Sequence, residues 1–328
     1  MDKKTSPLWH TGAPTADWDN AQAKLGAHFL QGSHWARFQV SLGKLAYYAS
    51  GDGWSWVAFV EKSHIGVRLY CPYGPTLANP KALQPALRSL VACARAHRAM
   101  FIRIEPQGPV TSNALHSAGL RKTSRDIQPH YTWVKDLDAS EENLIADMTA
   151  TNRNLYRTAN TKGLSFRSSN NPADIQHFLR LMHEVAQHNR IIVHSDNYFT
   201  TMAEILLPAG AGALYFAEHE KKIIAASFVF DSPTTRYYAH AGSQFDMRKL
   251  HPGSPLVSRM IVDAKQKGLR HFDFCGIAPP DQPNHPWTGI TTFKQSFGGR
   301  AVDMHGTWEL PIRSLSYRTY TALRKLVS

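Results

Sequence analysis

The sequence predicts an α/β (α+β) protein built from two copies of one unit, each with a mixed sheet flanked by helices. The chain has 328 residues, which is enough for two domains, and its apolar content of 43 % is sufficient for two cores. The order of three strands, one helix and a further strand occurs twice. The strands that close the two copies, at residues 101–106 and 271–276, are also similar in sequence. We therefore expect an internal duplication.

The first copy is predicted over residues 1–136. Three runs rich in β-branched and aromatic residues are separated by glycine-containing turns and predict strands at 45–49, 54–60 and 65–70. Residues 81–97 are predicted to form a helix, because Leu83, Leu87, Leu90 and Val91 recur on one face. A buried strand at 100–104, a short helix that ends at Gly119 and a strand at 131–134 complete this copy.

The second copy is predicted over residues 137–308. Ser140 and the two glutamates after it are typical of a helix start, and we expect one helix from there to residue 162, closed by Gly163. The remaining elements are expected as strands at 164–167, 212–218, 222–230, 235–241 and 271–275 and helices at 173–187, 198–206 and 255–267. An amphipathic stretch at 314–326 lies in the final segment, 309–328. We expect this segment to complete the first domain.

The composition favours an anionic partner. Lys and Arg number 37 against 25 Asp and Glu, a formal net charge of +12, although a basic protein without such a partner is an equally good interpretation of charge alone. The three cysteines have neither disulfide nor metal spacing, and we expect no metal. The two N-terminal lysines precede no apolar run, and the apolar stretch 223–230 is far too short to span a bilayer. We expect a soluble, cytoplasmic protein without a signal peptide.

One basic segment is a candidate phosphate-binding surface. Residues 149–173 contain no acid but include Arg153, Arg157 and Lys162. The two arginines are four residues apart and share a helix face, where an anionic ligand would relieve their repulsion. The alternative is a solvated helix face.

The segment 273–299 is the strongest candidate for a catalytic site, because a Gly- and Pro-rich loop follows a buried strand there. Lys294 is flanked by Phe293 and Phe297, and a lysine so placed can stabilise an oxyanion or hold a phosphate. The alternative is a lysine whose stem covers apolar surface. Asp273 and Glu105 end equivalent strands and are candidate general bases. Gly298-Gly299 resembles an acyl-CoA pyrophosphate loop only weakly, because an arginine follows.

Aromatic and histidine residues form a third group, with Tyr238 and His240 on a predicted strand and His194 and Tyr198 near a helix start. None of the histidines lies in a metal-binding motif, and no Gly-x-Ser-x-Gly nucleophile motif occurs.

Eight segments together resemble the FemABX family of aminoacyl-tRNA-dependent enzymes that build peptidoglycan cross-bridges. They are FLQGSHWARFQVSLG (29–43), YGPTL (73–77), FIRIEP (101–106), AGLRKTSRDIQPHYTWVKDL (118–137), MTATNRNLYRTANTKG (148–163), YYAHAGS (237–243), HFDFCGI (271–277) and HPWTGITTFKQSFGG (285–299). Their order and spacing span nearly the whole chain. The resemblance implies two tandem acetyltransferase-like (GNAT) domains, in the compact form without a coiled-coil insertion and with the active site in the second domain.

The resemblance also implies roles for particular residues. Lys294 matches the family's critical lysine, with Phe293 beside it in the same motif, and Arg153, Arg157 and Lys162 become candidates for tRNA binding. Further positions match the family's substrate site: Gln39, Tyr73, His194, Tyr198, Tyr238, His240 and Trp287. At three of them the sequence departs from the compact relatives, because Gln39 replaces a lysine, His194 an arginine and His240 a tyrosine. These changes leave open which precursor is bound.

The implied reaction transfers an amino acid from aminoacyl-tRNA to the stem-peptide amine of UDP-MurNAc-pentapeptide or of lipid II. It needs no cofactor, because the donor ester is already activated. Lipid II would bring the protein into transient contact with the inner face of the membrane. The alternatives are an acyl-CoA-dependent enzyme, a non-catalytic protein that binds the precursor, and an enzyme that modifies another amine acceptor.

Overall fold

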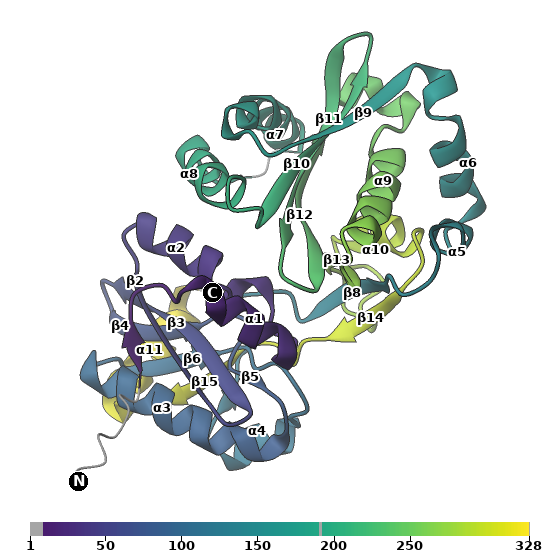
Figure 1. Cartoon of the computed structure of the whole chain (residues 1–328). Coiled ribbons are helices and arrows are strands. Elements are labelled where there is room, and N and C mark those ends of the chain that lie inside the picture. Colours follow the sequence, from purple (N-terminus) through teal and green to yellow (C-terminus); the bar gives the residue numbers. More distant parts are fainter. Residues whose placement is uncertain (1–8, 190–191, 328) are drawn as a thin grey trace. The chain divides into compact units, whose positions relative to one another are not determined.

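The computed structural model describes residues 9–189 and 192–327, so residues 1–8 of the N-terminal segment, where no signal peptide is expected, lie outside it. The chain divides into two compact units. Unit 1 comprises Met1–His130 with Asp303–Ser328, and unit 2 comprises Tyr131–Val302. Each unit has one mixed sheet with helices (Figure 1).

Unit 1 contains an eight-stranded sheet in the order β1-β2-β3-β4-β6-β15-β7, with β5 paired to β3. Only β4 and β6 are parallel among the strand pairs of its described residues. The strands are β1 (His10–Thr11), β2 (Leu45–Gly51), β3 (Trp54–Ser63), β4 (Gly66–Cys71), β5 (Thr76–Leu77), β6 (Phe101–Ile104), β7 (Arg121–Lys122) and β15 (Trp308–Pro311). The helices are α1 (Ala16–Leu25), η1 (Phe29–Gln31), α2 (Ser33–Ser41), η2 (Pro80–Ala82), α3 (Leu83–Ala96), α4 (Ser112–Ser117) and α11 (Ser314–Val327).

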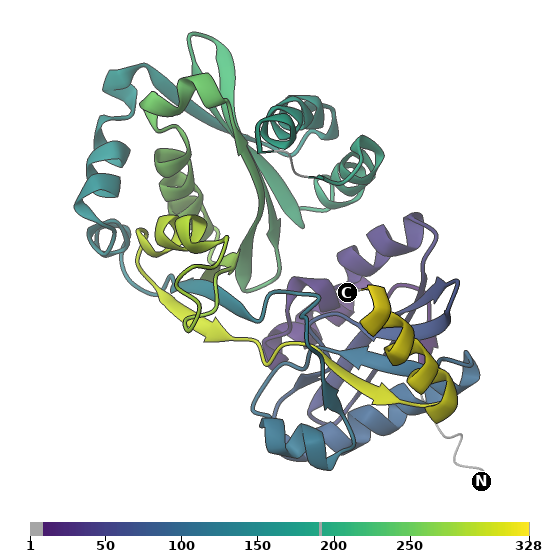
Figure 2. The ribbon, with the colours of Figure 1, turned by 180° about the vertical axis from the view of Figure 1, so that it is seen from behind.

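The alternation of side chains along β6 explains how the core of unit 1 is built. Ile102 and Ile104 point into the cluster that holds the apolar face of α3, whereas Phe101 packs against α11. The Phe101 ring lies 5.4 Å from that of Tyr317 and 4.8 Å from that of Tyr320. The C-terminal segment therefore adds both a strand and a covering helix to unit 1 (Figure 2).

Unit 2 contains a seven-stranded sheet in the order β14-β8-β13-β12-β11-β10-β9, in which β12 and β13 are parallel. The strands are β8 (Tyr131–Asp136), β9 (Leu164–Ser169), β10 (Gly212–His219), β11 (Lys222–Asp231), β12 (Thr235–Ser243), β13 (His271–Gly276) and β14 (Arg300–Asp303). The helices are α5 (Glu141–Ala146), α6 (Ala150–Thr158), η3 (Asn160–Lys162), η4 (Pro172–Asp174), α7 (Ile175–Asn189), α8 (Asp196–Leu206), η5 (Phe245–Leu250), α9 (Gly253–Gln266) and α10 (Thr288–Gln295). Helix α9 packs on one face of the sheet, and α7 and α8 cover the other (Figure 1).

The boundaries of the units differ from the predicted 1–136, 137–308 and 309–328. The strand expected at 131–134 to complete the first copy is β8, and its residues pair antiparallel with β13 in unit 2. The corresponding place beside β6 in unit 1 is taken by β15. The two units thus repeat one strand order, but the strand next to each closing strand comes from a distant part of the chain.

The helix expected over residues 140–162 is broken. Ser140 caps α5 as predicted, because its hydroxyl accepts a hydrogen bond from the Asn143 N–H. Thr149 then starts the separate helix α6 with a cap to the Asn152 N–H. In the described part of the chain, no helix combines the length and apolarity needed to cross a membrane.

Candidate functional site

Lys294 is buried beside the end of β13. Its side chain extends from α10 into unit 2, the residue is only 5 % exposed, and its Nζ donates a 2.5 Å hydrogen bond to the Gly276 carbonyl. This excludes the alternative of a lysine that covers apolar surface while its charge stays in water. Burial lowers the pKa of Lys294, although neighbouring Cys275 and Asp273 oppose that shift.

Asp273 is the carboxylate of this cluster. It is 4 % exposed, and burial raises its pKa to about 7, against the opposing effects of a hydrogen bond from the Cys275 N–H and the charge of Lys294. A carboxyl group with such a pKa is present in both protonation states near neutral pH, which is typical of functional sites.

The backbone between Asp273 and Gly276 is irregular. The register with β8 shifts there, and Cys275 has a φ of 61°, in the left-handed region that non-glycine residues rarely adopt. The Asp273 carboxylate holds this bulge through a 2.7 Å hydrogen bond from the Cys275 N–H. The bulge turns the Gly276 carbonyl to where Lys294 meets it, as bulges beside active sites often redirect groups.

A second bulge separates two predicted substrate residues. On β12, Tyr238 pairs with Val229 and His240 pairs with Phe228, so that Ala239 is the extra residue. Because of this bulge, Tyr238 joins the core on the α9 face, whereas the His240 ring lies 5.1 Å from that of Phe199 on α8. Residues two apart, which would share a face in a regular strand, therefore lie on opposite faces of the sheet.

The α8 face holds the other members of the aromatic group. The rings of His194 and Tyr198 are stacked 4.0 Å apart, and the His240 ring lies 6.4 Å from that of His194. Burial lowers the pKa of His240 to about 4 and also lowers the pKa of His194. Both imidazoles are therefore neutral at pH 7, and neither supplies a permanent charge for a phosphate.

Phe293 and Trp287 lie at the two ends of α10. Phe293 is partly buried, with its ring 5.1 Å from that of Phe297. Trp287 is 44 % exposed and contacts His285 at 5.4 Å between ring centroids. Phe293 thus anchors the helix that carries the lysine, while Trp287 presents an aromatic surface to solvent.

The two predicted substrate residues of unit 1 are both buried. Gln39 is 4 % exposed on α2. Tyr73 has a φ of 43°, its hydroxyl donates to the Pro129 carbonyl at 2.9 Å, and its ring lies 4.2 Å from that of His28. Glu105, the other candidate base, accepts hydrogen bonds from the Tyr73 and Gln128 N–H groups and from two hydroxyls, so its oxygens serve to hold loops together.

The predicted tRNA-binding residues differ in whether their side chains are free to bind a ligand. The Arg153 guanidinium donates to the carbonyls of Ala146 and Met148, at 3.0 and 2.5 Å, and so caps the end of α5. Arg157 and Lys162 are exposed. The helix break at residues 147–149, which could not be read from charge spacing, gives Arg153 this structural role.

Gly298 and Gly299 are explained by close packing. A Cβ at Gly299 would lie 2.5 Å from the Val134 carbonyl oxygen, and one at Gly298 would lie 1.9 Å from an Asp147 carboxylate oxygen. Both glycines have positive φ values, of 79° and 103° in chain order. These two glycines therefore let the chain pack closely against β8, and this packing explains why glycine occupies both positions.

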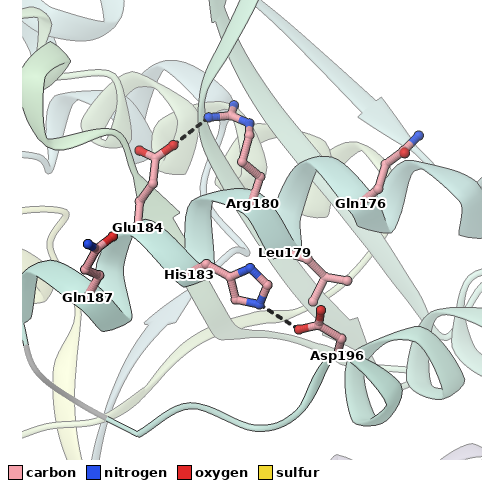
Figure 3. A pocket seen from close by; sticks show the side chains of 7 residues that line it. All are labelled: Gln176, Leu179, Arg180, His183, Glu184, Gln187 and Asp196. Atoms are coloured by element: carbon pink, nitrogen blue, oxygen red, sulfur yellow. Dashed lines mark hydrogen bonds and ion pairs between the residues drawn. The ribbon is translucent and has the colours of Figure 1, made fainter.

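A surface pocket of about 470 Å³ lies between α7 and the start of α8 (Figure 3). It is lined by Gln176, Leu179, Arg180, His183, Glu184, Gln187 and Asp196. Its charged groups are paired, Arg180 with Glu184 and His183 with Asp196, each at 2.7 Å. Within the described residues, no group of three or more His, Cys, Asp or Glu side chains is placed to hold a metal ion.

Sequence reasoning missed the parts of the site that belong to the backbone. Neither Cys275 nor Gly276 was predicted as a site residue, yet their bulge joins Asp273 to Lys294. A non-glycine residue with positive φ leaves no mark in a single sequence.

Comparisons with known proteins agree with this architecture. The profile of the acetyltransferase (GNAT) domain matches residues 148–294. The aminoacyltransferase FemA of Staphylococcus aureus (strain bovine RF122 / ET3-1) is 26 % identical over 110 residues, which are 33 % of this chain and 26 % of FemA. The crystal structure of FemX superposes with a TM-score of 0.82 at 16 % identity, over 94 % of this chain and 99 % of FemX.

The resemblance to the FemABX family is confirmed. A tandem GNAT protein from the clavulanic acid biosynthesis pathway also shares the fold, with a TM-score of 0.52, 13 % identity and coverage of 93 % of this chain and 98 % of its own. The predicted fold class of two tandem GNAT-like domains with mixed sheets is thereby confirmed as well. The FemA match spans about a quarter of the length of FemA, so the activity and substrates of this chain are proposals.

Proposed function

We propose that this FemABX-like protein transfers an amino acid from aminoacyl-tRNA to the stem-peptide amine of a peptidoglycan precursor. The GNAT domain and the likeness to FemA and FemX support an enzyme of the acyltransferase type. The observation that carries the finer proposal is the buried Lys294, held at the bulged end of β13 next to Asp273.

In the proposed reaction, the neutral amine attacks the carbonyl carbon of the aminoacyl ester. A carbon–nitrogen bond forms, the carbonyl oxygen becomes an oxyanion, and the ester carbon–oxygen bond then breaks to release the ribose hydroxyl of the tRNA. An ammonium has three N–H donors, and Gly276 accepts one of those of Lys294. The other N–H donors can stabilise the oxyanion, an effect of roughly 3 kcal/mol for a donor of this kind.

The amine nitrogen gains a positive charge on attack and must lose one proton, while the departing ribose oxygen must gain one. Asp273, with a pKa of about 7, is ionised to a large extent at neutral pH and is proposed as the group that accepts and returns this proton. Tyr238, whose pKa burial raises to about 12, stays protonated and is proposed to line the site.

The remaining predicted substrate residues enter the proposal with altered roles. His194, Tyr198 and His240 offer a neutral aromatic surface, suited to a sugar or peptide face more than to a diphosphate. Trp287 directly precedes α10, the helix that carries Lys294, and Phe293 lies within that helix. Gln39 and Tyr73 of unit 1 stay predicted substrate residues, and Arg157 and Lys162 are proposed to bind tRNA.

The test offers two acceptors separately to the purified protein and bulk tRNA charged with labelled amino acids. UDP-MurNAc-pentapeptide reports a soluble acceptor and lipid II in vesicles a membrane-linked one. The proposal expects label in one of them. Transfer from acetyl-CoA to either acceptor, without transfer from charged tRNA, would instead establish the acyl-CoA alternative.

A further inference from the structure

A second pocket in unit 2 has an uncompensated positive charge. It measures about 280 Å³ and lies where the turn between β10 and β11 meets α7. It is lined by His177, Arg180, Lys221, Lys222, Ile223 and Gln244. Among the described residues, no carboxylate lines it, in contrast to the pocket of Figure 3, which Glu184 and Asp196 line.

The acids nearby in sequence are directed elsewhere. Glu220 lies 3.9 Å from His219, and Glu184 pairs at 2.7 Å with Arg180, so the uncompensated charge of the pocket belongs to its two lysines. Over residues 9–189 and 192–327, Lys221 and Lys222 have no ion pair. Two adjacent ammonium groups at the mouth of one pocket repel each other unless an anion lies between them.

Backbone contacts hold both sides of the pocket. The Arg180 guanidinium also donates to the Ile223 carbonyl at 2.5 Å, which fixes its direction, and it has five N–H donors in all. On the other side, Glu220 and Lys221 form a two-residue turn with φ values of 49° and 63°, closed by the pairing of His219 with Lys222. Such a turn is normally formed by Asn-Gly, because both residues have positive φ. A lysine at positive φ lowers the stability of the turn, and a binding role would explain why it is present.

We propose that this pocket binds a backbone phosphate of the donor RNA, at a distance from the reaction site. This inference rests on the proposed function. Tyr237 on β12 pairs with Asp273 on β13, and Gln244 comes directly after the end of β12. With the extra residue Ala239 left out, six regular steps separate Tyr237 from Gln244, which is about 20 Å. At roughly 3.4 Å per step of a stacked strand, a phosphate in the pocket is about six nucleotides from the esterified end. Figure 1 shows the hairpin of β10 and β11 at the opposite end of unit 2 from β13 and α10.

The surroundings favour RNA over a membrane surface. A membrane-binding surface combines lysines with several exposed aliphatic side chains, whereas Ile223 is the aliphatic residue of this lining. Beside Gln244, the Phe245 ring is 43 % exposed, and its centroid lies 4.0 Å from the Arg248 guanidinium and 3.6 Å from the His188 ring. Stacked aromatic and cationic groups next to a basic pocket are typical of proteins that bind nucleic-acid strands.

The test compares the double variant Lys221→Ala/Lys222→Ala with the wild type in binding uncharged bulk tRNA. Losing the one phosphate contact of the pocket should reduce the steepness of log affinity against log salt by about 0.9. Between about 50 and 200 mM salt, the wild type should then lose about threefold more affinity than the variant. The control variant Lys24→Ala/Lys81→Ala removes two exposed lysines of unit 1 and should keep the wild-type slope.

A second variant, Lys221→Gly/Lys222→Gln, suits the positive φ of the turn and gives the same test if the alanine variant misfolds. An unchanged slope in a folded variant overturns the inference. So does lost binding to phosphatidylglycerol vesicles with tRNA affinity intact, which would identify a lipid site. Wild-type transfer activity is measured separately, and with an aminoacylated dinucleotide as donor the variant should match the wild type. A failure of the pocket is thereby distinguished from a failure of the proposed reaction.

Discussion

Replacing Asp273 by Asn should remove a pH-dependent cost to stability. Burial raises the folded-state pKa of Asp273 from the ordinary 3.8 to about 7, so the folded protein holds a proton that the unfolded chain has already lost in this window. Stability is therefore greatest below the ordinary pKa and falls as the pH rises from about 4 to about 7. At 1.36 kcal/mol per pKa unit, the full cost is about 4 kcal/mol.

The Asn variant keeps an oxygen that can accept the hydrogen bond from the Cys275 N–H, so the bulge should persist. Urea unfolding at about pH 4.5, 6 and 7.5, followed by circular dichroism, measures the effect. The difference in unfolding free energy between variant and wild type should grow with pH by several kcal/mol. Groups that titrate in both proteins cancel in this difference. Asp281→Asn, at an exposed carboxylate, is the control. A difference that stays constant from pH 4.5 to 7.5 would refute the account of Asp273.

Four further substitutions test other parts of the account. Gly299→Ala should destabilise the fold by about 2–4 kcal/mol in thermal unfolding, because the new Cβ would meet a carbonyl of β8 and the φ of residue 299 is positive. The control Gly253→Ala places its Cβ in open space and should leave stability unchanged. Arg153→Ala should cost about 1–2 kcal/mol of stability and leave the salt slope of tRNA binding unchanged. Arg157→Ala should leave stability unchanged and reduce the steepness of the salt dependence of tRNA binding by about 0.9. Equal effects of the Arg153 and Arg157 substitutions would contradict the capping role of Arg153. Burial lowers the folded-state pKa of His240, so the wild type should lose roughly 3 kcal/mol of stability as the pH falls from about 6.5 to about 4. His240→Phe should remove this loss. Stability curves of wild type and variant that fall together over this pH range would exclude this account of His240.

Local signals in the sequence were sufficient for many of the elements, although they did not predict α1, α2 or α10. The Ser140 cap, the apolar face of α3 and the β-branched runs each depend on near neighbours in the chain, and these features appear in the structure. Pairing between distant segments was not accessible in this way. Strand β8 follows the first copy directly, yet it pairs with β13 because strand partners are set by the tertiary fold.

The candidate site shows the same division. The sequence marked Lys294 as a candidate catalytic residue. Its contact with the Gly276 carbonyl depends on a bulge held by Asp273, which the sequence did not reveal. Tyr238 and His240 were grouped because alternate residues of a regular strand share a face, and the extra residue Ala239 separates them. Bulges are decided by packing against neighbouring strands, so sequence periodicity alone does not reveal them.

The central claim is that Lys294 promotes aminoacyl transfer, and a single-turnover assay tests it most directly. Preformed labelled aminoacyl-tRNA is mixed with an excess of enzyme and precursor, for the wild type, Lys294→Met and the exposed-neighbour control Gln295→Ala. The account predicts transfer by the wild type and the control, and a rate lower by about 10²–10³-fold in a folded Lys294→Met variant. Wild-type rates in a folded Lys294→Met variant would contradict it.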